Sequence, residues 1–161
     1  MILGVIPARY ASTRFPGKPL VDIKGKSMIQ RVYEQCKKSP ELSEVIVATD
    51  DARIQDHVLS FGGKVEMTGD HHVSGTERIA EVASRHPEFS HVINIQGDEP
   101  YIDPNQISLL CQTLTEAPHP DIATLIRPLK DASRLIDPNV VKVVKGNQGQ
   151  ALYFSRAPIP F

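Results

Sequence analysis

The stretch VIPARYASTRFPGKPL, residues 5–20, joins an apolar run to a basic loop. The apolar run at residues 2–6 predicts a buried first strand, which ends at the proline that follows it. The loop then carries Arg9, Arg14 and Lys18 among small and turn-forming residues. Small residues let backbone N–H groups approach phosphate oxygens, and the cations neutralise the phosphate charge. Because ligands of open α/β sheets bind beyond the carboxyl ends of the strands, this stretch predicts a polyanion site.

A solvated basic loop is the alternative interpretation, since three cations on a surface need no ligand. The position of the loop directly after a buried strand favours phosphate instead. The loop contains neither the GxxxxGK[ST] pattern of a Walker loop nor the GxGxxG pattern of a dinucleotide turn. The sequence therefore predicts a phosphate loop of another kind.

The length and composition predict one soluble domain. A chain of 161 residues suffices for one domain with a real core, so we expect a single domain over residues 1–161. The net charge of −1 gives no field that would draw the chain to nucleic acid or to a membrane, and neither is expected as a partner. Cys36 and Cys111 lack metal-site spacing and are expected to be reduced thiols. With no signal peptide and no membrane-spanning stretch, we expect a cytoplasmic protein.

Strand-like and helix-like runs alternate along the chain, which predicts an α/β fold with a mainly parallel sheet flanked by helices. Strands are predicted at residues 2–6, 44–49, 64–67, 91–96 and 122–126. Helices are predicted at residues 27–38, 51–61, 74–86 and 103–116, with a helical turn at 131–136. Ser27 with Gln30, and Ser74 with Glu77, have the spacing of capping boxes. A C-terminal β-hairpin is predicted from residues 140–144 and 151–154.

Asp98 and Glu99 directly follow the fourth predicted strand, in the sequence NIQGDEP. A carboxylate at this edge of the sheet is well placed to hold Mg²⁺ against substrate phosphates, because Mg²⁺ takes one or two protein oxygens and the rest from phosphate and water. The alternative is a β-turn in which Asp98 caps backbone N–H groups. The basic loop expected at the same edge favours metal binding by Asp98. Glu99 is the weaker candidate, since adjacent side chains point in different directions.

Three further polar residues near the predicted site have both a functional and a structural interpretation. Gln96 offers an amide that can read a base edge, or it is a buried amide satisfied by backbone groups. Ser74 opens a helix whose N–H groups suit an anion or a nucleoside hydroxyl, and it also serves as a helix cap. Arg78 lies one helical turn further and can point back to the same place.

Several other polar residues receive a structural interpretation. His71 and His72 are adjacent and lack a third ligand at suitable spacing, so we expect hydrogen-bonded loop residues rather than zinc ligands. Asp50 and Asp51 are adequately explained as a cap of the helix that follows them, rather than as a second acidic site. Lys142, in an alternating strand, is expected to point into solvent, and Arg156 can either lie on the surface or meet a substrate carboxylate.

The blocks quoted above resemble the sugar-activating cytidylyltransferases, and most closely the CMP-Kdo synthetase family (3-deoxy-manno-octulosonate cytidylyltransferases). The first matching block is IPARYASTRFPGKPL at residues 6–20. The others follow in order: VIVATDD at 45–51, MTGDHHVSGTER at 67–78, INIQGDEP at 93–100, DPNVVKVV at 137–144 and YFSRAPIP at 153–160.

The resemblance implies a Rossmann-like nucleotidyltransferase sheet and an enzyme that transfers CMP from CTP to Kdo, releasing pyrophosphate, for lipopolysaccharide biosynthesis. It implies Mg²⁺ as cofactor, CTP and Kdo as substrates, and a homodimer for the full-length protein. Asp98 is the implied metal ligand and, with Arg9 and Lys18, a catalytic residue. The implied nucleotide-binding residues are Arg9, Arg14 and Lys18 for the triphosphate and Ser74, Arg78 and Gln96 for the cytidine. Arg156 is implied on the sugar side.

Members of this family continue well past the position equivalent to Phe161. The resemblance implies that the missing region carries a second metal-binding aspartate, much of the Kdo pocket and most dimer contacts. We therefore expect a C-terminally truncated chain that binds CTP weakly at best and turns over poorly or not at all. Two alternatives stay open: a catalytically impaired nucleotide-binding fragment, and activation of another acidic sugar such as sialic acid. The STRFPGKPL block favours Kdo.

Overall fold

The structure, a computed structural model, describes residues 1–11, 15–116 and 121–159. The chain divides into two compact units, Met1–Ala123 and Thr124–Phe161. That the two units form one domain stays a prediction. Arg14 lies outside the described residues.

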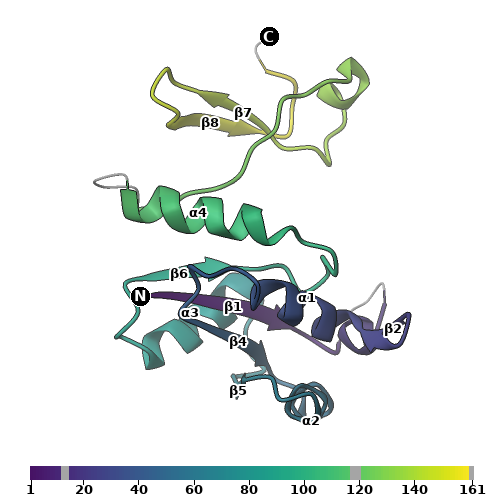
Figure 1. Cartoon of the computed structure of the whole chain (residues 1–161). Coiled ribbons are helices and arrows are strands. Elements are labelled where there is room, and N and C mark those ends of the chain that lie inside the picture. Colours follow the sequence, from purple (N-terminus) through teal and green to yellow (C-terminus); the bar gives the residue numbers. More distant parts are fainter. Residues whose placement is uncertain (12–14, 117–120, 160–161) are drawn as a thin grey trace. The chain divides into compact units, whose positions relative to one another are not determined.

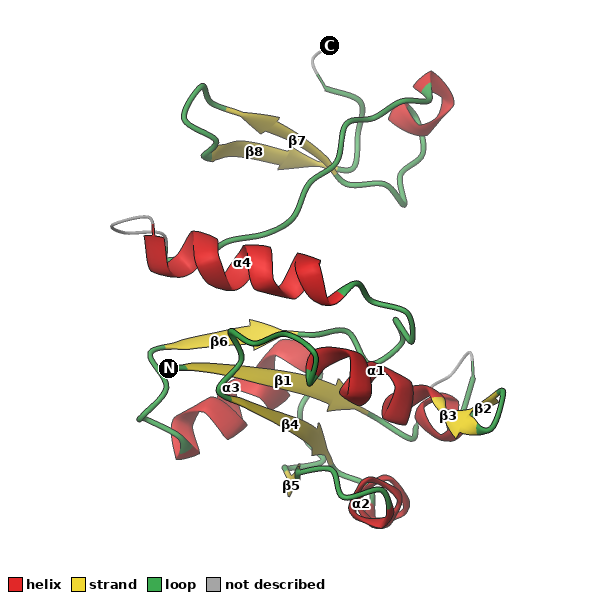
Figure 2. Cartoon of the chain, in the orientation of Figure 1, coloured by secondary structure: helices red, strands yellow, loops and turns green. Residues whose placement is uncertain are grey.

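The first unit is built on a parallel sheet, as predicted from the alternation of strands and helices. Among the described residues the sheet has four strands, in the order β5-β4-β1-β6, and all three pairings are parallel. Figure 1 and Figure 2 show the arrows of β1, β4 and β6 running in the same direction. The strands are β1 (Ile2–Ala8), β4 (Glu44–Thr49), β5 (Val65–Met67) and β6 (His91–Asn94).

Four helices of the first unit follow the predicted positions closely. They are α1 (Met28–Cys36), α2 (Ala52–Ser60), α3 (Gly75–Arg85) and α4 (Pro104–Glu116). A short 3-10 helix η1 (Lys18–Leu20) and a small ribbon of β2 (Asp22–Ile23) and β3 (Lys26–Ser27) lie between β1 and α1 and were not predicted.

Helices cover both faces of the sheet because side chains of β1 alternate between the faces. Ile2 and Ile6 pack in one core cluster with side chains of α1, α2 and α4. Leu3 and Val5 pack in a second cluster with Ile79 of α3 and its neighbours. Both clusters are buried, so β1 is apolar along its whole length, as strands buried on two faces are.

The predicted helix caps are present, but the capping boxes differ from the expected form. The Ser27 hydroxyl accepts a hydrogen bond from the N–H of Gln30 at 3.2 Å, yet the Gln30 side chain donates to Glu34 instead of reaching back. Ser74 likewise accepts from the N–H of Glu77 at 3.2 Å, and the Glu77 carboxylate accepts from the N–H of Val73. Asp51 caps α2 as predicted, through the N–H of Arg53.

The predicted strand at residues 122–126 is wrong. These residues form no strand and belong to no ladder within the described part of the chain, and Ile122 is 86% exposed. An apolar run becomes a strand only where a neighbouring strand can accept its backbone hydrogen bonds, and here none does so. The fourth predicted strand is also shorter than expected, because β6 ends at Asn94.

The second unit contains the predicted helical turn and hairpin. The elements are the 3-10 helix η2 (Ala132–Leu135), β7 (Lys142–Lys145) and β8 (Ala151–Ser155), and the two strands pair antiparallel. Asp131 caps η2 through the N–H of Ser133 at 2.9 Å.

The expectation that Lys142 points into solvent is wrong. This lysine is only 6% exposed, and its Nζ donates to the carbonyl oxygens of Asp137 at 2.8 Å, Val140 at 2.9 Å and Arg156 at 2.5 Å. Three carbonyl acceptors satisfy the three N–H donors of the ammonium group, which is why the charge can be buried.

Candidate functional site

The basic loop and the GDEP turn meet at the carboxyl edge of the sheet, as predicted. Nζ of Lys18, in η1 after β1, lies 2.6 Å from Oδ2 of Asp98, which follows β6. The side chains are 37% and 51% exposed, so this ion pair stays open to solvent and to a ligand. Parallel strands place their carboxyl ends at the same edge, and this brings together residues that are 80 positions apart in the chain.

Close packing around Pro7 holds three segments of this edge together. A Cβ on Gly97, just before Asp98, would lie 2.9 Å from the carbonyl oxygen of Pro7. A Cβ on Gly75, at the start of α3, would lie 3.2 Å from Cγ of Pro7. Glycine at these positions therefore lets the turn after β6 and the first turn of α3 approach the end of β1.

Three further residues predicted to bind the nucleotide, Arg9, Ser74 and Gln96, occupy the same edge. Arg9 directly follows β1 and is exposed. Ser74 caps α3, whose first turn packs on Pro7. Gln96 is exposed beyond the end of β6, and its amide nitrogen donates to Oδ1 of Asn94 at 3.1 Å. The alternative of a buried Gln96 amide is thus wrong, and the amide is accessible to a ligand.

Arg78 lies inside the protein rather than on the open edge. Its side chain is fully buried, with Nη2 2.6 Å from Oδ2 of Asp50 and Nη1 hydrogen-bonded to the hydroxyl of Thr68. Nε of Arg78 has no hydrogen-bond partner among the described residues. The sequence interpretation missed Asp50 and Thr68 as partners, because only the pairing of β4 with β5 brings their two segments together.

Asp98 fits a Mg²⁺ ion that also binds phosphate. It offers a half-exposed carboxylate whose Oδ2 holds Lys18, while Oδ1 accepts no hydrogen bond from the described residues. The described residues contain no group of three or more His, Cys, Asp or Glu side chains that could hold a metal by themselves. Mg²⁺ bound with one protein carboxylate and several phosphate oxygens needs no such group.

His72, of the adjacent histidine pair, is a hydrogen-bonded loop residue. Nε2 of His72 is hydrogen-bonded to the carboxylate of Glu81, and the His71 and His72 ring centroids are 4.4 Å apart. The hydrogen bond from His72 lowers the pKa of the Glu81 carboxyl below its usual range. His72 therefore ties the segment before α3 to the helix itself.

Arg156 belongs to the second unit. Its side chain is exposed, and Nη1 donates to the carbonyl oxygen of Pro138 at 2.9 Å. The backbone carbonyl of the same residue accepts from Lys142. Both contacts lie within the second unit and tie this residue to the loop before β7 and to the first residue of β7.

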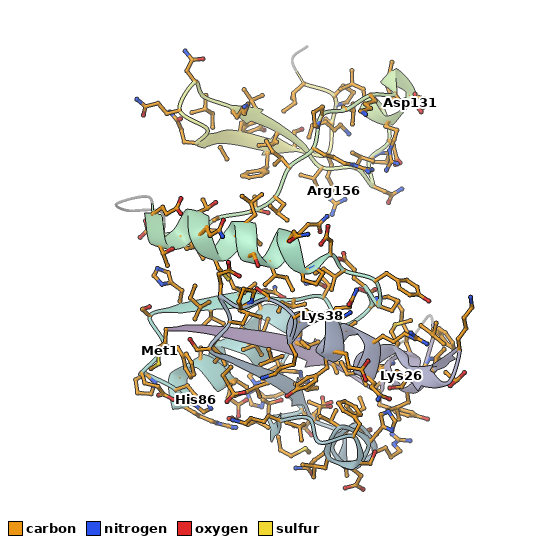
Figure 3. All side chains as sticks on the ribbon, viewed as in Figure 1. Met1, Lys26, Lys38, His86, Asp131 and Arg156 are labelled. Atoms are coloured by element: carbon orange, nitrogen blue, oxygen red, sulfur yellow. The ribbon has the colours of Figure 1, made fainter. Side chains whose placement is uncertain are left out.

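A cavity of about 480 Å³ lies near the residues where β4 and β5 begin. Its lining includes Glu44 at the start of β4, Val65 at the start of β5 and His86 after α3. Figure 3 shows His86 and Met1 at one end of the sheet and Lys26 at the other. Charged groups of this cavity pair with one another, as Lys64 does with Glu44, and its lining includes neither Lys18 nor Asp98.

No helix in the parts of the chain that the structure describes is long and apolar enough to cross a membrane.

Comparison with known proteins agrees with this architecture. A family model described as cytidylyltransferase matches residues 3–161. The 3-deoxy-manno-octulosonate cytidylyltransferase of Protochlamydia amoebophila is 51% identical over 162 residues, which cover 99% of this chain and 62% of the relative. The enzyme of the same name from Syntrophotalea carbinolica is 54% identical over 159 residues, covering 99% of this chain and 63% of the relative. The chain thus spans less than two thirds of the length of these curated relatives.

Solved structures give the same result. The structure of a CMP:2-keto-3-deoxy-manno-octonic acid synthetase complexed with CTP is 47% identical and superposes with a TM-score of 0.93, covering 99% of this chain and 66% of that one. A cytidylyltransferase from Leptospira borgpetersenii, 23% identical with a TM-score of 0.60, shares the fold over 68% of this chain and 46% of its own. With a family model that spans nearly all of its residues, and relatives that are about half identical along 99% of its length, the chain belongs to the cytidylyltransferase family.

Proposed function

We propose that this chain forms the nucleotide half of an enzyme that transfers CMP from CTP to Kdo and releases pyrophosphate. The observation that carries the proposal is the contact of Lys18 with Asp98, because it joins a phosphate-binding cation to a metal-binding carboxylate at one open edge. The similarity to relatives named for this reaction, one of them solved with CTP, supports it.

The cations of the loop after β1 would bind the triphosphate. Lys18 supplies a compact charge and Arg9 a planar fork, and both follow a buried strand that fixes their starting point. Arg14 is proposed for the same role on the resemblance alone. When a triphosphate binds, its oxygens can replace Asp98 as the partner of Lys18, which leaves the carboxylate free for a cation.

Ser74, Gln96 and Arg78 would hold the cytidine. The first turn of α3 presents backbone N–H groups beside Ser74, and these suit an acceptor atom of the nucleoside. The exposed amide of Gln96 can both donate and accept, as reading a base edge requires. Arg78 is proposed for the cytidine on the resemblance alone, and because it is buried against Asp50 and Thr68 it would act by holding the ends of β4 and β5 in place.

Asp98 would bind Mg²⁺, which when present supplies charge neutralisation at the phosphates. The anomeric hydroxyl of Kdo would lose its proton to solvent and attack the α-phosphorus of CTP, and the bond to pyrophosphate would break on the opposite side. Arg9 and Lys18 stabilise the departing charge and hold the triphosphate in line, so positioning and electrostatics supply the catalysis. The reaction needs no protein nucleophile.

We further propose, from the resemblance, that Arg156 meets the Kdo carboxylate and that residues 1–161 belong to a single nucleotidyltransferase domain. The full-length protein would act as a homodimer in the cytoplasm and supply CMP-Kdo for lipopolysaccharide biosynthesis.

The test is calorimetric titration of the chain with CTP, UTP, ATP and GTP, each with and without Mg²⁺. Selective and Mg²⁺-dependent binding of CTP is expected. Pyrophosphate release from CTP should then be measured for the full-length protein with Kdo and with sialic acid as acceptors, and the proposal requires that Kdo is preferred. Equal binding of all four nucleotides would contradict the proposal, as would a preference for sialic acid.

A further inference from the structure

The loop after β1 is closed at its base by two contacts between Tyr10 and Gly17. The N–H of Gly17 donates to the carbonyl oxygen of Tyr10 at 2.9 Å. The Tyr10 ring also lies against Gly17, so closely that a Cβ there would be 3.2 Å from the ring. Gly17 has a φ of +71°, in the left-handed region that favours glycine. Lys18 is the next residue, so this closure fixes the position of the Lys18 backbone.

Tyr10 is in turn covered by an arginine from a different element. The guanidinium carbon of Arg53, in the first turn of α2, lies 3.3 Å from the centroid of the Tyr10 ring. Asp51 holds this guanidinium with both carboxylate oxygens, at 2.9 Å to Nε and 2.6 Å to Nη2. A guanidinium held by two hydrogen bonds is oriented, so its stacking fixes the position of the ring beneath it.

These contacts form a continuous path from α2 to the phosphate loop. Asp51 orients Arg53, Arg53 covers the Tyr10 ring, and the ring packs against Gly17. Gly17 precedes Lys18, which contacts Asp98 across the edge of the sheet. Tyr10 is also partly buried and packs against the main core, which adds a second support for its position.

We propose that Arg53 is a positioning residue for the phosphate-binding loop and that it acts through the ring of Tyr10. The inference rests on the proposed function, since the ligand of the loop is taken to be the triphosphate of a nucleotide. Arg53 orders the loop before the ligand arrives, so the entropy cost of ordering Lys18 does not reduce the binding affinity.

Inorganic tripolyphosphate is the probe of choice, because it tests the loop without the base. Its affinity should be measured by calorimetry for the chain and for Arg53→Met, Tyr10→Leu and the double variant. We expect each single substitution to weaken binding by about threefold to tenfold, since each removes the same stacking contact. The double variant should bind no more weakly than the weaker of the two single variants, as residues acting in one path do.

Matched substitutions separate positioning from charge and from damage to the fold. Arg85→Met removes the same charge from the far end of α3 and should leave the affinity unchanged. Tyr10→Phe keeps the ring and should also bind normally, and Arg53→Lys keeps a cation and should restore part of the affinity. If Arg53→Met does not fold, these conservative variants and Tyr10→Leu still decide the question.

The inference is overturned if Arg53→Met weakens binding while Tyr10→Leu does not, because Arg53 would then contact the phosphates directly. It is also overturned if the unsubstituted chain does not bind tripolyphosphate. A separate titration with the four nucleotides tests the proposed function. If tripolyphosphate binding depends on Arg53 but the chain shows no preference for CTP, the inference about Arg53 stands and the cytidylyltransferase proposal is contradicted.

Discussion

Nζ of Lys18 lies 2.6 Å from Oδ2 of Asp98, and this pair joins the loop after β1 to the turn after β6. Either residue alone is an ordinary surface charge. Together they place a cation beside a carboxylate, as the proposed site for a metal-bound triphosphate requires.

Lys18→Ala should lower the affinity for CTP about tenfold, because a charge-assisted contact to phosphate is lost. The measurement is calorimetric titration in the presence of Mg²⁺. Lys26→Ala is the matched control, since Lys26 is a comparably exposed lysine that also lies 2.6 Å from its carboxylate partner, Glu34. Equal loss of affinity in both variants would contradict a specific role for Lys18.

Asp98→Asn should abolish the increase in CTP affinity that Mg²⁺ brings. The amide is a neutral and weaker metal ligand, so titrations with and without Mg²⁺ should become nearly superimposable for this variant. Glu99→Gln, at the adjacent exposed position, should retain the Mg²⁺ effect. Retention of the effect in Asp98→Asn would mean that another residue holds the metal.

Arg78→Met should destabilise the protein by about 3–5 kcal/mol, since it leaves the carboxylate of Asp50 without its buried cationic partner. The free energy of unfolding can be measured by urea denaturation. A double variant, Arg78→Met with Asp50→Asn, should recover part of the loss because no unpaired charge is left. A loss no greater than that of Arg85→Met, which removes an arginine side chain that is 42% exposed, would contradict the expectation.

Lys142→Met should loosen the hairpin of the second unit. The carbonyls of Asp137, Val140 and Arg156 would lose their common donor, at a cost of about 1–3 kcal/mol. Hydrogen exchange of the β7 and β8 amides should become faster than in the unsubstituted chain. Lys145→Met, at an exposed position in the same strand, should leave the exchange rates unchanged.

His86 should make stability depend on pH near neutrality. Hydrogen bonds to Glu66 and then to Glu88 raise the pKa of His86 above its ordinary value of 6.5. The raised pKa means that its contribution to the free energy of unfolding is fully present below pH 6.5 and is lost as the pH rises through the folded-state pKa.

Urea denaturation at a series of pH values checks this expectation. His86→Gln should flatten the decline in stability above neutral pH, and Glu66→Gln should flatten it partly, because Glu88 would still accept a hydrogen bond. An unchanged pH dependence in His86→Gln would assign the decline to other groups.

Most elements could be predicted because their signals are local. The apolar run of β1, the serine and aspartate caps and the Gly-rich turn of the hairpin each act within a few residues. The strand predicted at residues 122–126 failed because a strand depends on a partner that the local sequence does not contain. The prediction for Lys142 failed for a related reason, because the carbonyl oxygens that accept hydrogen bonds from its buried ammonium group come from three places in the second unit.

The sequence by itself determined that an α/β sheet carries a basic loop after its first strand and a carboxylate after its fourth. Strand polarity puts both at the same edge, so Lys18 and Asp98 could be expected to meet. Only the tertiary structure decided that Arg78 pairs with Asp50 inside the protein and that Arg53 covers Tyr10. These contacts depend on the order of the strands and the packing of helices from separate segments, and neither is encoded in the periodicity or spacing of a single stretch.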